Sequence, residues 1–156
     1  MVTPTLEPPM PALAVGQKTI LLVEDDNSIL SLFTTDLEEQ GYKVLKAGSA
    51  PEALQICRGY TGPIHLLLTD IYLPANQGLS FAGGSTPKGT MNGLDLTRQV
   101  ELLRPQIRVV LMSGQSTEGL KAFDQVRKGK PFLWKPVSTG TLLRTVRETL
   151  GETAKG

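Results

Sequence analysis

Acidic side chains stand at two points of the sequence where a short apolar run ends. Glu24, Asp25 and Asp26 follow the first such run of the chain, and Asp70 follows the third. Carboxylates within about 4–6 Å of one another raise one another's pKa unless a cation lies among them. Oxygen ligands without histidine or cysteine favour Mg²⁺, which readily takes a phosphate oxygen as a further ligand. If the fold brings these acids together, the sequence predicts a magnesium site.

A hydroxyl and an ammonium group stand at corresponding points later in the chain. Ser113 follows the fourth apolar run, and Lys135 follows the fifth. Two unit charges about 4 Å apart interact by roughly 4 kcal/mol at an effective dielectric constant of ~20, so a divalent ion and one lysine can balance the acids. A carboxylate that attacks phosphorus beside such cations performs phosphoryl transfer, and the covalent product is an aspartyl phosphate. These residue types therefore predict phosphoryl transfer to a carboxylate.

The elements that must position these residues alternate along the chain between residues 19 and 150. Five short apolar runs are predicted strands, over residues 20–23, 43–47, 64–69, 108–112 and 132–134. The segments between them have the spacing of amphipathic helices; Ile29, Phe33 and Leu37, for example, lie four residues apart. Strands that alternate with helices through short connections predict a parallel sheet covered by helices on both faces. Ligands of such sheets bind beyond the carboxyl ends of the strands, where the polar residues stand.

Capping residues mark several of the predicted helices. Ser49 and Glu52 have the spacing of a capping box, and Ser138 can cap the last helix. A further, rather polar helix is predicted over residues 117–128. Trp134, in the fifth predicted strand, is expected to pack against a covering helix.

Composition narrows the classes of protein that fit. The chain has 156 residues, which suits one domain, and its 16 basic and 15 acidic residues leave a net charge of +1. That balance gives no charge footprint for nucleic acid or an anionic membrane. One cysteine excludes an internal disulfide framework, and one histidine argues against a His-rich metal site. The sequence has no targeting segment and no apolar run near the ~18 residues of a membrane span, so we expect a cytoplasmic protein.

The domain itself is predicted over residues 18–151. Residues 1–17 contain four prolines and few core-forming residues, which indicates a disordered leader or linker. Residues 152–156 are small and polar and are predicted to be a flexible tail. Residues 75–90 contain four glycines and one proline, so we expect a long inserted loop after the third strand, beside the predicted site.

Four motifs, each at the end of a predicted strand, resemble those of the response-regulator receiver domain. They are Val23-Glu24-Asp25-Asp26, Leu68-Thr69-Asp70-Ile71-Tyr72-Leu73-Pro74, Met112-Ser113-Gly114 and Leu133-Trp134-Lys135-Pro136. The resemblance covers nearly all of residues 19–150, and parts of it are similar to the receivers of hybrid histidine kinases. It implies an α/β, flavodoxin-like (βα)5 three-layer sandwich with five parallel strands in the order 2-1-3-4-5. It also implies a regulatory domain that catalyses its own phosphorylation and dephosphorylation, rather than an enzyme acting on other substrates.

The resemblance implies a role for each acidic residue. Asp70 would accept a phosphoryl group from the phosphohistidine of a histidine kinase or phosphotransfer domain. Asp25 would bind Mg²⁺ directly and Glu24 through water. Asp70 and the backbone carbonyl of Tyr72 would complete the protein's ligands to the metal ion.

The resemblance also implies how phosphorylation would change the surface. Ser113 would hydrogen-bond a phosphoryl oxygen, and Lys135 would pair with that oxygen. The peptide bond between Lys135 and Pro136 is expected to be cis. Phe132 stands where the family has its switch aromatic, and it would turn inward behind Ser113. The face made by the fourth helix, fifth strand and fifth helix would then bind a downstream protein. No direct contact with nucleic acid or a membrane is expected.

Two other interpretations remain open on the sequence. A pseudo-receiver, which is not phosphorylated and acts only as an interaction module, would share the fold, but the complete set of acids, hydroxyl and lysine argues against it. A phosphatase of the haloacid dehalogenase type would need an Asp-x-Asp pair after the first strand. Glu24-Asp25-Asp26 does not supply that pair, and Asp70 is followed by Ile71-Tyr72.

Overall fold

The computed structural model of the chain describes residues 17–73, 92–114 and 129–152. Four predictions therefore lie outside the described residues, wholly or almost wholly. They are the leader over 1–17, of which only Gln17 is described, the loop over 75–90, the helix over 117–128, and the tail over 152–156, of which only Glu152 is described.

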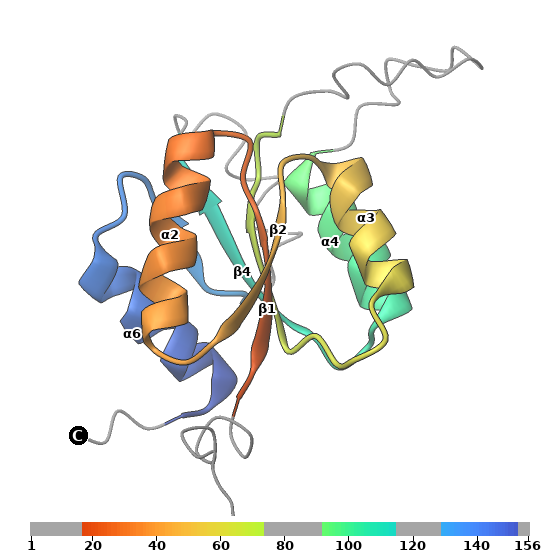
Figure 1. The fold of residues 1–156 in the computed structure, drawn as a ribbon. Coiled ribbons are helices and arrows are strands. Elements are labelled where there is room, and N and C mark those ends of the chain that lie inside the picture. The colour runs from red at the N-terminus through yellow and green to blue at the C-terminus, as the bar shows by residue number, and fades with distance from the viewer. Residues whose placement is uncertain (1–16, 74–91, 115–128, 153–156) are drawn as a thin grey trace, which may run out of the picture.

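The described chain contains one five-stranded sheet, and all of its neighbouring strands run parallel (Figure 1). The strand bounds are Thr19–Val23 (β1), Lys43–Ala47 (β2), Leu66–Asp70 (β3), Arg108–Ser113 (β4) and Phe132–Trp134 (β5). Their order across the sheet is β2-β1-β3-β4-β5, which confirms the predicted topology. The three central strands are almost entirely buried, because helices cover both faces of a parallel sheet.

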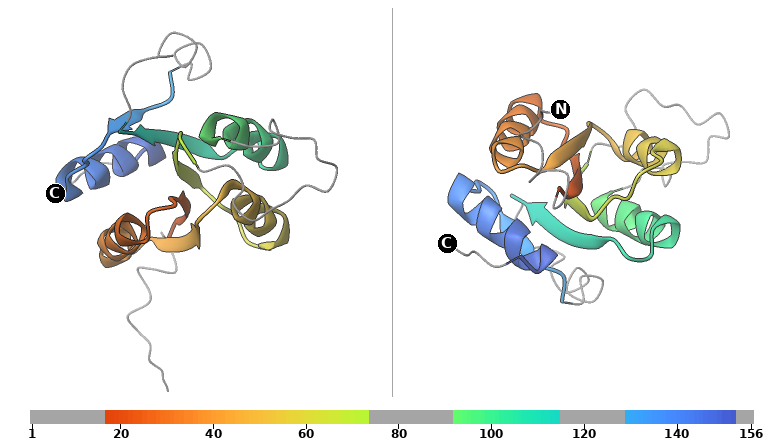
Figure 2. Two further views of the ribbon diagram at one scale, coloured as in Figure 1. Left: turned by 90° about the horizontal axis from the view of Figure 1, so that it is seen from above. Right: turned by 60° about the horizontal axis from the view of Figure 1, so that its bottom comes forward.

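Four helices lie in the described part of the chain, two on each face of the sheet (Figure 2). Their bounds are Asn27–Glu39 (α2), Ala50–Gly59 (α3), Gly93–Leu103 (α4) and Thr139–Leu150 (α6). On one face α3 and α4 bury Leu54, Leu96 and Val100 against Leu21 and Leu67 of the sheet. On the other face α2 and α6 bury residues such as Leu37 and Leu142 against Leu22, Leu68 and Val110. The alternation of side chains along each strand therefore divides the core into two layers.

Local hydrogen bonds explain where the helices begin. The Asp26 carboxylate accepts hydrogen bonds from the N–H groups of Ser28 and Ile29 and so caps α2. Ser49 accepts the N–H of Glu52 at the start of α3, as predicted. The predicted capping box is wrong in its second half, because the Glu52 carboxylate accepts the N–H of Gly48 and not that of Ser49.

The amino ends of the strands carry a separate set of polar contacts that join distant parts of the chain. The Tyr42 hydroxyl donates to Glu152 Oε1 at 2.7 Å, and Lys18 Nζ lies 3.6 Å from Glu152 Oε2. His65 precedes β3, which begins two residues later than the predicted Ile64, and its Nδ1 accepts the N–H of Thr19. These contacts hold Lys18 and Glu152, which lie near the two ends of the described chain, beside each other at the end of the sheet away from the acidic residues.

In the described part of the chain no helix combines the length and the apolar character that crossing a membrane requires.

Candidate functional site

The register of the sheet brings the predicted site residues to one edge. Val23 pairs with Thr69, and Asp70 pairs with Met112. Glu24 therefore follows the last residue of β1, and Asp70 is the last residue of the neighbouring strand β3. Ser113, the last residue of β4, pairs with Trp134, the last residue of β5. Because all five strands are parallel, their carboxyl ends meet at the same edge. Glu24, Asp70, Ser113 and Lys135 are thus placed side by side by strand pairing alone.

Lys135 bridges two buried carboxylates. Its Nζ lies 2.6 Å from Glu24 Oε1 and 2.7 Å from Asp70 Oδ2. Glu24 is 1% exposed and Asp70 is 6% exposed, so both ion pairs are largely shielded from water. The Lys135–Pro136 peptide is cis, as predicted. The Lys135 N–H donates to the carbonyl of Ser113, which ties the segment after β5 to the end of β4.

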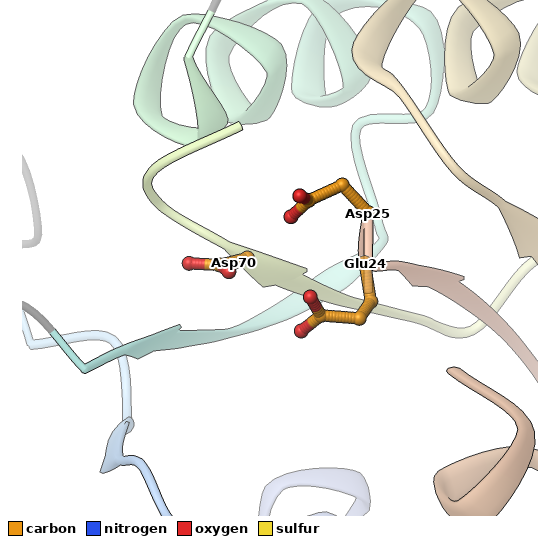
Figure 3. Close-up of side chains that lie close together, drawn as sticks. All are labelled: Glu24, Asp25 and Asp70. Carbon is orange, nitrogen blue, oxygen red and sulfur yellow. The ribbon is translucent and has the colours of Figure 1, made fainter. Parts of the chain in front are cut away.

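The second oxygen of each buried acid is held by the backbone. Glu24 Oε2 accepts the N–H of Asp26 at 3.0 Å, and Asp70 Oδ1 accepts the N–H of Tyr72 at 3.1 Å. Asp25 is exposed and points toward the same space as the two buried acids (Figure 3). Ligand atoms of Glu24, Asp25 and Asp70 all lie within 4.8 Å of one another. Three hard oxygen donors at this separation fit a divalent cation such as Mg²⁺.

The third acid of the first motif has a different role. Asp26 caps α2 through its side chain and donates its N–H to Glu24 Oε2. It therefore orients the neighbouring carboxylate instead of joining the group that could hold a metal ion.

Burial and charge shift the pKa values of the two buried acids and of the partly buried Lys135. Burial raises the pKa of Glu24, which the hydrogen bond from Lys135 only partly offsets. Burial likewise raises the pKa of Asp70, against the hydrogen bond and the charge of Lys135. For Lys135 burial lowers the pKa, but the hydrogen bonds to Asp70 and Glu24 outweigh it and leave the pKa raised. One protonated lysine therefore only partly balances the negative charge of Glu24, Asp25 and Asp70, and a further cation would stabilise the site.

Ser113 and Phe132 lie where the sequence places them. Ser113 is 3% exposed at the end of β4, next to the segment that carries Lys135. Phe132 is partly buried against the core layer of α3 and α4, and its ring meets the Trp134 ring edge-on at a centroid separation of 4.6 Å. Trp134 is 48% exposed, and its packing against a covering helix stays a prediction. The switch role of Ser113 and Phe132 stays a prediction.

Tyr72 contributes to the site through its backbone. Its N–H donates to Asp70, while its side chain is 48% exposed. The predicted coordination of a metal ion by its carbonyl oxygen stays a prediction.

Gly93 is a site residue that the sequence analysis missed. It begins α4, and its N–H donates to the carbonyl of Ile71 at 2.7 Å. A Cβ atom on Gly93 would lie 2.1 Å from the carbonyl oxygen of Asp70, which no side chain can tolerate. The glycine therefore lets the start of α4 press against the backbone that carries Asp70. A signal for it in the sequence is its place directly after Asn92, the residue that caps α4.

A parallel sheet of this order, with acids, a serine and a lysine at its carboxyl edge, defines a receiver-type signalling module. Residues 20–83 match the family model of the response regulator receiver domain. The response regulator receiver protein CpdR of Brucella abortus is 28% identical, over 85% of this chain and 97% of that protein. A CheY-like receiver domain protein of Methanospirillum hungatei is 28% identical, with a TM-score of 0.69 over 87% of this chain and 95% of that one.

The receiver domain of the hybrid histidine kinase CckA is also similar, at 28% identity and a TM-score of 0.63 over 85% of this chain and 98% of that domain. The match to the family model over residues 20–83, together with these similar proteins, identifies a receiver domain of two-component systems in this chain. It spans 13% of the length of the first curated relative it matches, a sensor kinase of Brucella abortus, and 35% of the second, a transcriptional regulatory protein of Pseudomonas aeruginosa.

Proposed function

We propose that Asp70 accepts a phosphoryl group from the phosphohistidine of a histidine kinase or phosphotransfer domain, with Mg²⁺ bound at the same edge. The observation that carries this proposal is the Lys135 ammonium between two buried carboxylates, 2.7 Å from Asp70 Oδ2. That position lets the lysine approach an oxygen of any group bonded to the Asp70 carboxylate. Buried lysine–carboxylate pairs also occur in proteins for purely structural reasons. Here, however, a third acid, Asp25, lies close enough to Glu24 and Asp70 for all three to bind one metal ion.

The transfer step uses the carboxylate of Asp70 as nucleophile. One of its oxygens attacks phosphorus, and a new P–O bond forms as the P–N bond of the phosphohistidine breaks. The electron pair of the broken bond stays on the imidazole nitrogen. Because the other ring nitrogen of the phosphohistidine carries a proton, the donor leaves as a neutral histidine. Lys135 and the Ser113 hydroxyl hold phosphoryl oxygens and stabilise the negative charge on them.

Glu24, Asp25 and Asp70 are the side chains that would hold Mg²⁺, with the Tyr72 carbonyl as a further ligand. When bound, the ion supplies positive charge beside the phosphoryl oxygens and offsets the crowding of the acids. Glu24 is oriented for this role by the N–H of Asp26. Asp25, which is exposed, is the ligand most accessible to an incoming ion.

The output of the domain is proposed to be a change of surface. Ser113 moves toward the phosphoryl group and Phe132 turns in behind it, which alters the face that includes β5 and α6. Trp134 and the partly buried Phe132 are two large side chains on β5 that such a rearrangement would displace. A downstream protein would bind this face, and the proposed place of action is the cytoplasm.

The test is phosphorylation by a small donor. The chain is incubated with acetyl phosphate and Mg²⁺ and then analysed by intact-protein mass spectrometry. We expect a mass increase of one phosphoryl group in the wild type, none in Asp70→Asn, and loss of the product when EDTA replaces Mg²⁺. Asp26→Asn is the matched control and retains phosphorylation, because asparagine caps a helix as well as aspartate does.

The same experiment separates the rival functions. An unmodified wild-type chain would refute the proposal and favour the pseudo-receiver, which only binds partners. Continuous turnover of a general phosphomonoester, with phosphate released in many equivalents per chain, would instead favour a phosphatase.

A further inference from the structure

The edge strand β2 presents backbone groups that face away from the sheet. Lys43 N–H donates to the Lys18 carbonyl and the Ala47 carbonyl accepts the N–H of Glu24, so these two residues of β2 face β1. Successive residues of a strand alternate in direction, and therefore the N–H and C=O groups of Val44 and Lys46 face outward. Among the described residues no strand pairs with that side of β2. Figure 1 shows β2 at the edge of the sheet, with α3 beside it.

An apolar groove of about 500 Å³ lies between this edge and helix α3. Leu45 of β2 lines it from one side, and Ile56, Gly59 and Tyr60 line it from the other. Leu45 and Ile56 are only partly buried, so they offer apolar surface that the fold leaves accessible. The groove is open beside Gly59, since a Cβ atom there would meet nothing within 4 Å. A chain paired with β2 could place alternate side chains into this groove.

Two lysines give the groove its charge. Lys43 and Lys46 are both exposed on β2, and Lys43 Nζ lies 5.1 Å from the centre of the Tyr60 ring. Lysines on an edge strand oppose pairing with another basic strand, which includes β2 of a second copy of this chain. They attract acidic side chains instead, and so they select the partner by charge. The groove is therefore suited to a segment that is apolar on one side and acidic at other positions.

We propose that the outer edge of β2 and the groove beside α3 form a docking site for an extended segment of a partner protein, in which apolar and acidic residues alternate. The segment adds a strand to the sheet by pairing with Val44 and Lys46, and its apolar side chains enter the groove. None of the residues of the proposed phosphorylation site takes part. The two proposals can therefore fail independently.

The first test is an NMR titration of the isotope-labelled full chain with an end-blocked heptapeptide that alternates valine and glutamate. We expect shift changes concentrated in residues 43–47 and 55–60, and slower hydrogen exchange at the Val44 and Lys46 amides. A heptapeptide that alternates valine and lysine should bind at least about tenfold more weakly, because its charge opposes that of the groove. Absence of shift changes at millimolar peptide, or equal binding of both peptides, would refute the proposal.

Two matched pairs of variants test the geometry. Gly59→Glu fills the groove with a negative side chain and should weaken binding of the glutamate peptide by about tenfold or more, whereas Gly59→Ala should leave it nearly unchanged. Lys46→Pro removes an outward N–H, while Lys46→Gln removes only the charge. Binding should be lost in Lys46→Pro and merely reduced in Lys46→Gln. Equal binding by Lys46→Pro and Lys46→Gln would rule out strand addition, and this pair decides the matter even if Gly59→Glu fails to fold.

Sedimentation of the wild type identifies the other possible occupant. We expect a monomer at all concentrations in the absence of peptide. A dimer that dissociates on the Lys46→Pro change would show that a second copy occupies the edge, and it would overturn the proposal of an acidic partner segment.

Discussion

A single lysine decides the charge balance of the site. Lys135 contacts two carboxylates that are almost fully buried, and burial raises the pKa of both. An ion pair shielded from water costs desolvation energy on both sides, so it is weak support for the fold by itself. Removing one partner is a different matter, because the remaining charges are then left uncompensated. A metal ion or a phosphoryl group bound at the site would change this balance between Lys135 and the two carboxylates.

We predict that Lys135→Met destabilises the fold by about 3–5 kcal/mol near neutral pH, because two buried carboxylates lose their counter-charge. The loss of Lys135 raises the pKa of Glu24 and Asp70 further above the ordinary values near 4. The folded variant then holds protons that the unfolded chain releases, so its free energy of unfolding falls as pH rises from about 4. The deficit against the wild type should therefore shrink in acid. Urea unfolding at about pH 4 and pH 7 measures it.

The control for this prediction is Lys18→Met. Lys18 pairs with Glu152 at the other end of the sheet, where both side chains are 30% exposed. We expect it to cost about 1 kcal/mol or less, as exposed ion pairs do. Equal costs for the two substitutions would contradict the account of Lys135 given above.

Neighbouring acids should respond differently to magnesium. We predict that Mg²⁺ raises the thermal midpoint of the wild type, because it binds the folded chain and not the unfolded one. Asp25→Asn should remove most of that increase, since a carboxylate of the proposed metal site is lost. Asp26→Asn should preserve it, because Asp26 caps α2 and asparagine caps equally well. A calorimetric scan of the three proteins with and without Mg²⁺ checks this, and equal increases in all three would place the ion elsewhere.

At the scale of elements, the site depends on how closely helix α4 approaches strand β3. Gly93 donates its N–H to Ile71 and leaves no room for a side chain against the Asp70 carbonyl. The capping box of α4, formed by Asn92 and Asp95, fixes where the helix starts. The acceptor residue is therefore held from two directions, by the pairing of β3 and by the end of a helix.

We predict that Gly93→Ala destabilises the fold by about 1–3 kcal/mol or more, because the added methyl group forces the helix away from the strand. The displacement should also reduce the yield of acetyl-phosphate labelling at Asp70. Gly140→Ala provides the matched control, since position 140 lies in the first turn of α6 and its Cβ would meet nothing within 4 Å. That substitution should stabilise by roughly 0.5–1 kcal/mol through helix propensity. Changes of the same sign in both variants would count against the close approach.

Local patterns predicted the strands and the polar residues at their ends, whereas the resemblance to receiver domains predicted the strand order and the roles of the site residues. Apolar runs that end in polar residues locate the carboxyl ends of β1, β3, β4 and β5. The resemblance of the motifs predicted that Asp70 and Lys135 belong to one site, and in the structure Lys135 Nζ lies 2.7 Å from Asp70 Oδ2. These features need no knowledge of distant contacts beyond the rule that parallel strands align.

Other features could not be predicted because they depend on which of several neighbours a group meets. The Glu52 carboxylate can reach either of two preceding N–H groups, and it takes that of Gly48. Asp26 could have joined the acids or capped the helix, and it caps the helix. Spacing says nothing about a clash such as that at Gly93, which arises only when α4 is packed against β3. The edge-on contact between the Trp134 and Phe132 rings, with about half of the Trp134 surface exposed, likewise depends on tertiary packing.

At the scale of the whole molecule, the two ends of the sheet carry different kinds of polar residues and contacts. The carboxyl end gathers the acids, while the amino end carries contacts that join distant parts of the chain. Tyr42 and Glu152, which are 110 residues apart in sequence, are joined there by a hydrogen bond of 2.7 Å. Burial and this bond raise the pKa of the Tyr42 hydroxyl.

We predict that this contact gives the fold an alkaline limit. Tyrosine in the unfolded chain loses its proton near pH 10, whereas Tyr42 in the folded chain keeps it to higher pH. The unfolded state therefore binds fewer protons above about pH 10, and the free energy of unfolding falls as pH rises. Tyr42→Phe should cost about 1 kcal/mol near pH 8 and should lack this part of the decline. Urea unfolding between about pH 8 and pH 11 compares the two slopes, and parallel curves would disprove the link.

The meeting of Lys18 and Glu152 has a consequence for how this domain can be combined with others. Because the entry and exit of the described chain are a salt bridge apart, the whole unit could be spliced into a loop of a host protein without stretching it. A circularly permuted version, closed by a short bridge and reopened on another surface turn, should fold as the parent does. In either arrangement, the carboxyl edge of the sheet, with Glu24, Asp70 and Lys135, stays away from the attached protein.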